Sequence, residues 1–140
     1  MATDEKLELL RRIPLFAGCD HRHVQRIGQL AEEVDVPAGK VLIRQGDTGG
    51  DLMIIASGSV SVERDGARIS TLGAGDYFGE IALIDGGART ATVTAEAPSR
   101  LVVVGHREFH ALMDEMPAVA AQILATLARR VRGLDERAGH

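Results

Sequence analysis

Hydrophobic residues near the N-terminus recur at the spacing of an α-helix. Leu7 and Leu10 fall on one face of a first helical run. A second run, from about His21 to Leu30, begins after Asp20, a residue type that favours the N-cap position. The pattern therefore predicts helices over residues 1–31.

From residue 32 onward, hydrophobic and polar residues alternate in short runs separated by glycine-containing turns. Such alternation is typical of β-strands, and Asp65-Gly66 is a strong hairpin signal. The expected strands cover 33–36, 41–43, 52–55, 60–62, 69–72, 92–94 and 101–104. Short strands at close spacing predict a β-sandwich or barrel over residues 32–105.

Helical spacing returns after Gly105. One helix is expected from Arg107 to Glu115, and Pro117 fits the first turn of a last helix that runs to about Gly133. The hydrophobic positions of the last helix follow a short heptad pattern and are Ala120, Leu124, Leu127, Val131 and Leu134. Two interpretations fit this pattern: packing against the β-region, or the seam of a dimer.

Length and composition narrow the class of protein. A chain of 140 residues fits one domain, and the net charge of −4 argues against a general nucleic-acid binder. Aromatic residues make up only 3%, which argues against single-strand binding by base stacking. Cys19 is the only cysteine, so a disulfide framework and a thiolate zinc cluster are excluded. Without a signal pattern or a long apolar run, the chain is expected to be cytoplasmic, with no membrane partner.

Residues 78–91 do not follow the strand rhythm. Ala82-Leu83-Ile84 is long enough for one helical turn, and the free N–H groups that begin such a turn favour an anion. Arg89 adds a guanidinium fork suited to a phosphate, and its side chain is expected to face solvent. Glu80 is a good acceptor for a hydroxyl group. An anion site beside a hydroxyl acceptor predicts a sugar phosphate as ligand.

These residues resemble a known motif. Gly79-Glu80-Ile81-Ala82-Leu83, followed by Arg89-Thr90-Ala91, is similar to the phosphate-binding cassette of the cyclic nucleotide-binding domain family, including the spacing from glutamate to arginine. Further matches in the family's order are Pro37-Ala38-Gly39, Arg44-Gln45-Gly46-Asp47, Ile54 to Val60 and Gly75 to Phe78. The resemblance runs from about Leu7 to Leu134.

The resemblance implies a mainly β fold with flanking helices. In this fold a double-stranded β-helix, or jelly roll, forms a β-roll with N-terminal helices and two C-terminal helices. A single cyclic nucleotide-binding domain would then cover residues 1–140. Its parts would be the N-terminal helices over 1–31, the β-roll over 32–105 with the cassette at 79–91, and the C-terminal helices, or lid, over 106–135.

The family's ligand contacts can be carried over by residue. Glu80 would accept a hydrogen bond from the ribose 2′-hydroxyl, and Arg89 would neutralise the cyclic phosphate. The backbone N–H groups of Ala82 and Thr90 would add phosphate contacts. The rest of the cassette set is Gly79, Ile81 and Ala91.

Other expected contacts lie outside the cassette. Val62, Ile69 and Leu72 match positions that line the sugar and base pocket in the cAMP receptor protein branch of the family. Arg130, on the last helix, matches a basic position that approaches the cassette glutamate, and Arg132 is a candidate to cover the base. Both arginines also fit solvated charges near a helix C-terminus.

The implied function is a stand-alone cyclic nucleotide sensor and not an enzyme, with cAMP as the ligand and no cofactor. Movement of the last helix would pass the signal to an effector protein or to a second copy of the chain. No direct contact with nucleic acid is expected, because the chain stops where the bacterial activator branch begins its helix-turn-helix. Thr90 keeps a cGMP-selective sensor as an alternative, since a threonine there contacts guanine in some family members.

Three other interpretations compete with this one. Glu80 and Arg89 can form a simple ion pair in a structural or protein-interaction module that binds no ligand. A metal-dependent cupin enzyme would need histidines on its strands, and none occurs between His23 and His106. His106 and His110 are four residues apart on one helix face, but no third metal ligand is evident.

Overall fold

The computed structural model describes residues 3–137; the side chains of residue 130 and of residues 134–137 lie outside that description. Its helices are α1 (Thr3–Arg11), the short 3-10 helix η1 (Pro14–Phe16), α2 (His21–Leu30), α3 (Glu80–Asp85), α4 (His106–Glu115) and α5 (Pro117–Arg137). Its strands are β1 (Glu32–Val36), β2 (Val41–Ile43), β3 (Leu52–Ser57), β4 (Ser59–Arg64), β5 (Ala67–Gly73), β6 (Tyr77–Phe78), β7 (Thr92–Ala95) and β8 (Ser99–Val104).

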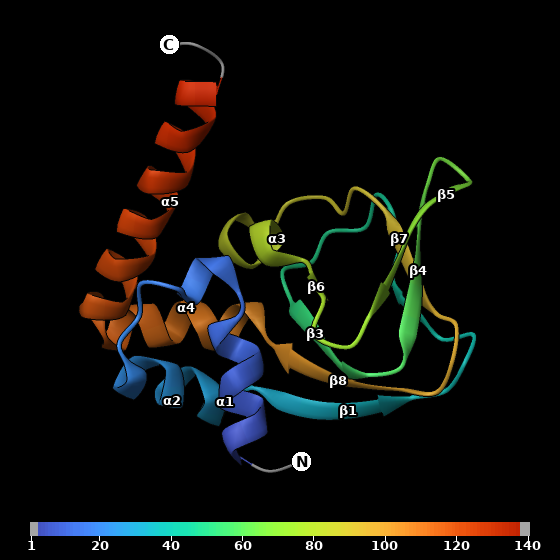
Figure 1. Ribbon diagram of the computed structural model, residues 1–140, viewed down its shortest axis with the longest axis horizontal. Helices are drawn as coiled ribbons and strands as arrows, with labels where there is room; N and C mark the ends of the chain where they lie inside the picture. Colours follow the sequence, from blue (N-terminus) through green and yellow to red (C-terminus); the bar gives the residue numbers. More distant parts are fainter. Residues whose placement is uncertain (1–2, 138–140) are drawn as a thin grey trace.

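The strands form two antiparallel sheets of four strands each. One sheet has the order β1-β8-β3-β6 and the other β2-β7-β4-β5, so neighbours in each sheet are mostly distant in sequence. Figure 1 shows the helices α1, α2, α4 and α5 gathered at one end of this pair of sheets, with α3 between them and the strands. The expected fold class, a jelly-roll-like β structure with flanking helices, is confirmed.

Two hydrophobic clusters hold these layers together. The larger one joins the helices to the sheet of β3 and β8 and includes Phe16, Leu52 and Phe109. The smaller one lies between the two sheets around Val60 and Val93. Leu83 of α3 belongs to the larger cluster, so the cassette is packed against the helical end of the roll.

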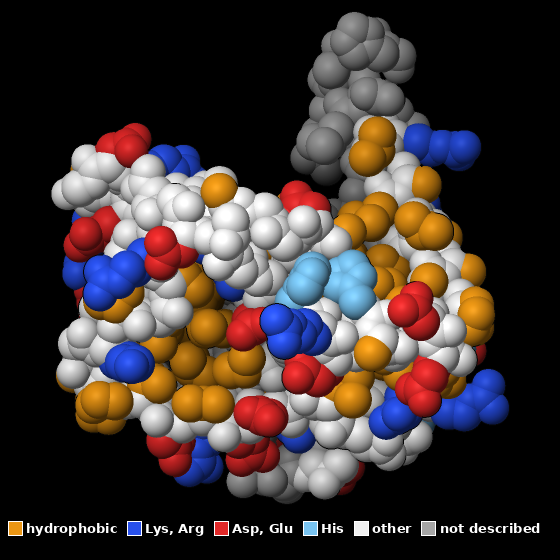
Figure 2. Space-filling view, turned by 180° about the vertical axis from the view of Figure 1, so that it is seen from behind, with side chains coloured by type: hydrophobic (Ala, Val, Ile, Leu, Met, Phe, Trp, Pro, Cys, Tyr) orange, Lys and Arg blue, Asp and Glu red, His pale blue; other side chains and the backbone are white. Residues whose placement is uncertain are grey.

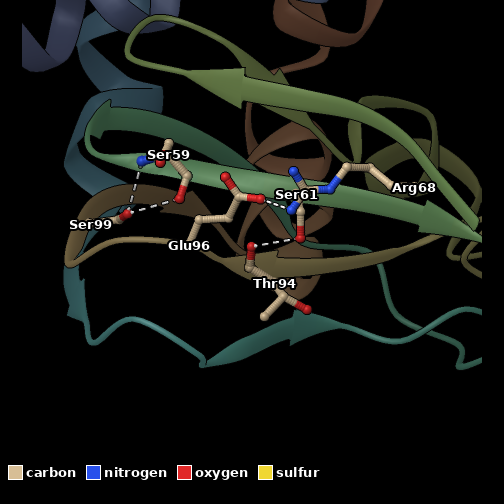
Figure 3. A network of polar contacts seen from close by, with 6 residues as sticks. All are labelled: Ser59, Ser61, Arg68, Thr94, Glu96 and Ser99. Carbon is tan, nitrogen blue, oxygen red and sulfur yellow. Dashed lines mark hydrogen bonds and ion pairs between the residues drawn. The ribbon is translucent and has the colours of Figure 1, made fainter.

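At the end of the roll away from the cassette, side-chain hydrogen bonds join segments that are distant in the sequence (Figure 3). Ser99 lies across from Ser59 and bonds both its N–H and its carbonyl oxygen, and Arg68 pairs with Glu96. Gly58 has a φ of +101°, and a Cβ there would fall 2.7 Å from the Cα of Ser99. Only glycine fits this approach, which keeps the start of β4 close to the start of β8.

The sequence predicted most elements within one or two residues. Four elements differ from the expectation. Neither η1 nor β6 was predicted, the single turn expected at 82–84 is a six-residue helix, α3, and α5 ends at Arg137 instead of about Gly133. Asp20 does stand at the N-cap of α2, but its carboxylate makes no capping hydrogen bond. Its backbone N–H is instead oriented toward Gln122 of α5, at 3.4 Å from Oε1.

Helix α5 packs on α4 and η1 and extends beyond the rest of the molecule (Figure 1). Its buried residues are Val119, Ile123 and Thr126. Leu124 and Val131 of the expected heptad are 66% and 57% exposed, so this face does not pack on the β-region. The packing alternative of the sequence analysis is therefore wrong for these positions; Leu134 lies outside the described side chains.

None of the described helices is long and apolar enough to cross a membrane by itself. Residues of α4 and α5, up to Gly133, pass that test by length and composition only when they are taken together, and they are bent by 111° at the break between them. The cytoplasmic location expected from the sequence stays a prediction.

Candidate functional site

The cassette, residues 79–91, begins with helix α3. Gly79 precedes the helix with a φ of +88°, and Gly86 ends it with a φ of +63°. Both are left-handed conformations that glycine adopts without steric cost, so the glycines set where this short helix starts and stops. The first α-helical bond runs from the Leu83 N–H to the Gly79 carbonyl at 3.1 Å, which leaves the earlier N–H groups of α3 without partners inside the helix.

Arg89 is buried, with 8% of its surface exposed, which corrects the expectation that its side chain faces solvent. Its Nη2 donates a hydrogen bond to the backbone oxygen of Asp51 at 3.0 Å. Its Nη1 has no hydrogen-bond partner among the described residues. Burial lowers the pKa of Arg89, and the nearby Asp51 opposes this shift. A buried guanidinium nitrogen without a partner is costly, and an anionic ligand would remove that cost.

The unpartnered nitrogen lies at the start of the cassette helix. A Cβ placed on Gly79 would be 2.7 Å from Arg89 Nη1 and 2.5 Å from the Asp51 carbonyl oxygen. Gly49 covers the other side of the guanidinium, since a Cβ there would be 3.6 Å from Nη2. Arg89 and the N-terminal end of α3 are thus held together by backbone segments that tolerate no side chain at residue 79.

A hollow of about 550 Å³ opens beside this pair. It is lined by Ile43 of β2, by both residues of β6, by α3 and by residues 87–90. Glu80 faces it and is only 7% exposed, while Ile81 at its rim is 58% exposed. The structure therefore brings Gly79, Glu80, Ile81, Ala82, Arg89 and Thr90 around one hollow.

The end of the cassette joins the strand that follows. The side chain of Thr90 is exposed, and its carbonyl oxygen accepts a hydrogen bond from Arg64 Nε at 3.1 Å. Ala91 is buried where the chain enters β7. Through Arg64 the tip of the β4–β5 hairpin is tied to the cassette.

The residues expected to line the sugar and base pocket do not lie together. Val62 and Leu72 pack against the cluster between the sheets. Ile69 is 50% exposed and lies at an irregularity in the register, where Val62 pairs with Ser70 and Glu63 with Arg68. Residues Val62, Ile69 and Leu72 are not among the residues that line the hollow, and their contact with a ligand stays a prediction.

The expected lid residues are on the exposed part of α5. Arg132 is exposed, and the side chain of Arg130 lies outside the described residues. Because α5 packs on α4 and η1, a role for these arginines over the hollow stays a prediction.

Several residues of the site were not found by sequence reasoning. Asp51 positions Arg89 through its backbone oxygen, and Tyr77 and Phe78 supply the aromatic side of the hollow. The adjoining glycines, Gly49-Gly50, are the one local signal, because paired glycines mark a close approach of backbone to another group. What approaches them, an arginine forty residues later in the chain, is visible only in the fold.

Comparison with known proteins agrees with this geometry. The family model "Cyclic nucleotide-binding domain" matches residues 33–116. The CRP-like cAMP-activated global transcriptional regulator of Mycobacterium tuberculosis is 31% identical over 130 residues, which cover 89% of this chain and 58% of that protein. The cyclic AMP receptor protein of Thermus thermophilus is 34% identical, over 87% of this chain and 59% of its own length. The chain thus spans less than two thirds of either relative.

A solved structure gives the same result. The N-terminal domain of a transcriptional regulator from Streptomyces coelicolor A3(2) has a TM-score of 0.83 and 33% identity, over 91% of this chain and 95% of that one. The cassette geometry, the family model and this likeness agree along most of the chain. The protein therefore belongs to the cyclic nucleotide-binding domain family, a family of regulatory ligand-binding domains.

Proposed function

We propose that this chain is a sensor that binds a cyclic nucleotide, with cAMP as the ligand, at the hollow beside α3. The observation that carries the proposal is the buried Arg89, whose Nη1 has no hydrogen-bond partner within the described part of the chain and lies against the start of the cassette. A cyclic phosphate carries one negative charge and two exposed oxygens. It can accept hydrogen bonds from the guanidinium and from the N–H groups at the start of α3.

Support for cAMP comes from the names of the relatives. Those from M. tuberculosis and T. thermophilus are named for cAMP, as is a cAMP-dependent protein kinase regulatory subunit of Schizosaccharomyces pombe that is 33% identical over 94% of this chain. The exposed hydroxyl of Thr90 at the rim favours the second candidate, cGMP, because it is able to bond a guanine edge. The proposed role is binding and not catalysis, with no cofactor.

Calorimetric titration with cAMP and cGMP, each added to the same protein preparation, tests this function. We expect saturable binding of both, with cAMP the tighter by at least about tenfold, a difference of about 1.4 kcal/mol. Tighter binding of cGMP would overturn the choice of ligand and leave the site intact. No heat and no thermal stabilisation with either nucleotide would favour the module that binds no ligand.

The proposed output is a change in the position of α5, read by an effector protein or by a second copy of the chain. Leu124 and Val131 leave an apolar surface on this helix, and α5 contacts α4, which in turn contacts α3. A ligand that binds one arrangement of these helices better than another shifts the population toward it. The contact from α3 to α4 to α5 is the route by which the cassette influences the helix.

Leu124→Trp provides a reporter for this movement, because the chain has no tryptophan of its own. Leu124 is exposed, so the larger ring is accommodated without disturbing the core. We expect added cAMP to shift the tryptophan emission, and a Gln25→Trp control on the exposed side of α2 to stay unchanged. A shift that grows with protein concentration identifies a second copy as the reader. Binding without any shift at position 124 would contradict an output through α5.

A further inference from the structure

Two histidines of α4 contact the cassette helix at one atom. His106 Nδ1 and His110 Nε2 each lie 2.9 Å from the backbone oxygen of Leu83 in α3. A carbonyl oxygen only accepts, so both ring nitrogens must carry their proton. The Leu83 oxygen would otherwise lack a donor at the end of the helix, because the Gly87 N–H bonds the Asp85 carboxylate instead. The imidazoles thus complete the hydrogen bonds of the cassette helix.

The same histidine is also joined to the support of Arg89. The backbone N–H of His106 donates to Oδ1 of Asp51 at 3.1 Å, and the backbone oxygen of Asp51 accepts from Arg89 at 3.0 Å. Gly50 allows this contact, since a Cβ there would be 2.3 Å from the His106 ring. Asp51 therefore links the start of α4 to the guanidinium of Arg89. The His106 side chain links the same end of α4 to α3.

The two rings are close to each other and to several charges. Their centroids are 4.2 Å apart, and Figure 2 shows adjoining histidine side chains at the surface, flanked by acidic and basic ones. The charged groups around the pair come from each neighbouring element. They are Asp51 (bonded to the His106 N–H and to Arg89), Glu80 and Asp85 on α3, Glu32 of β1, and Arg107 and Glu108 on α4 itself.

We propose that His106 and His110, together with Asp51, are positioning residues that hold the cassette in its ligand-binding geometry, and that this hold weakens when both imidazoles are protonated. The inference rests on the proposed function, because it concerns the same site. None of the three residues needs to touch the ligand. They act through the Leu83 oxygen and through Arg89, whose Nη2 is bonded to Asp51 and whose Nη1 lies beside Gly79.

The direction of the pH effect follows from the spacing of the two rings. Imidazole groups gain protons between about pH 8 and pH 5. With both rings charged, like charges would stand about 4 Å apart, and their repulsion favours separation of the rings. Acidification therefore weakens the linked arrangement. Binding should be tight near neutral pH and weaken as the pH falls.

The test compares two double variants with the wild type. In the first, His106→Asn keeps an N–H donor near the Nδ1 position and His110→Gln keeps one near the Nε2 position. Neither amide side chain titrates. For cAMP we expect the wild type to bind about tenfold more weakly at about pH 5.5 than at about pH 7.5, from like-charge repulsion at this spacing. The Asn/Gln variant should match the wild type at the higher pH and lose most of this dependence. His106→Ala with His110→Ala should bind weakly at both.

A wild-type affinity that is independent of pH, or an Asn/Gln variant that keeps the full dependence, would overturn the proposal. A second measurement does not depend on the ligand. Nitrogen-15 NMR of the imidazoles should find His106 as the Nδ1–H tautomer and His110 as the Nε2–H tautomer at neutral pH. The opposite tautomers would exclude the bonds to Leu83, whereas correct tautomers without nucleotide binding would contradict the proposed function alone.

Discussion

Arg89→Ala is expected to weaken the binding of cAMP by at least about 100-fold, because two or more charge-assisted hydrogen bonds to the phosphate are each worth about 1.5–3 kcal/mol. The effect is large because the guanidinium is already buried and positioned. Nη2 is bonded to the Asp51 oxygen, and Nη1 has no hydrogen-bond partner among the residues that the structure describes. Calorimetry or a fluorescent-nucleotide competition assay measures the change.

The fold should tolerate this substitution. Removing Arg89 leaves the Asp51 oxygen without its donor, at a cost of about 1–3 kcal/mol. It also removes a buried nitrogen for which the described residues supply no partner, which offsets part of that cost. Urea unfolding of the variant measures the balance. Because Arg89 is not exposed to solvent, a moderate decrease in the free energy of unfolding is expected.

Arg100→Ala is the matched control, since it removes the same charge from β8, where Arg100 pairs with Asp35 of β1 at 2.8 Å. The control should bind cAMP as the wild type does. Arg89→Lys keeps the charge but not the fork, and we expect it to recover only a small part of the lost affinity. If Arg89→Ala retains affinity within about threefold of the wild type, the site is wrongly assigned.

The strands could be predicted from the sequence because their signals are local. Asp65-Gly66 forms the β4–β5 turn with both residues at positive φ, 54° and 81°, the conformation for which such dipeptides are selected. Strand β6 is only two residues long and pairs with β3, so no alternating pattern has room to develop. Pairing between distant strands, such as β1 with β8, is set by the whole fold.

The composition of the cassette was predictable, but the environment of its arginine was not. Gly79, Glu80 and Arg89 lie within eleven residues of one another, and a short motif is enough to recognise them. The burial of Arg89 depends on Gly49 and Asp51, which come from the loop before β3. A sequence pattern does not show that such a loop folds over a side chain forty residues away.

The last helix illustrates a different limit. Its hydrophobic residues occupy more than one face, and the heptad through Leu124 and Val131 is the most regular set. The structure buries the neighbouring face of Val119 and Ile123 against η1 and α4. The periodicity predicts that a helix forms. Which face of that helix is buried depends on where η1 and α4 lie.

Glu80→Gln should reduce the affinity for cAMP by about 10- to 100-fold, because a hydrogen bond to a charged acceptor contributes about 1.5–3 kcal/mol. Glu80 is the first residue of α3 and lines the hollow. The residue before it, Gly79, lies against the guanidinium of Arg89. If the phosphate binds there, the ribose 2′-hydroxyl is the ligand group that a carboxylate bonds best. The expected loss therefore applies to the ribose form of the ligand.

A double-mutant cycle with 2′-deoxy-cAMP isolates this contact. The wild type should discriminate against the deoxy ligand, and Glu80→Gln should discriminate less, because its amide oxygen is an uncharged and weaker acceptor. Asp85→Asn serves as control, because Asp85 is an exposed carboxylate at the same hollow and its loss changes the charge equally. Since Glu80 is buried, urea unfolding must show that the variant is folded before its affinities are compared. Unchanged discrimination in a folded Glu80→Gln variant would mean that the ribose hydroxyl is bound elsewhere. If Asp85→Asn also loses discrimination, the effect comes from the local charge and not from the hydrogen bond.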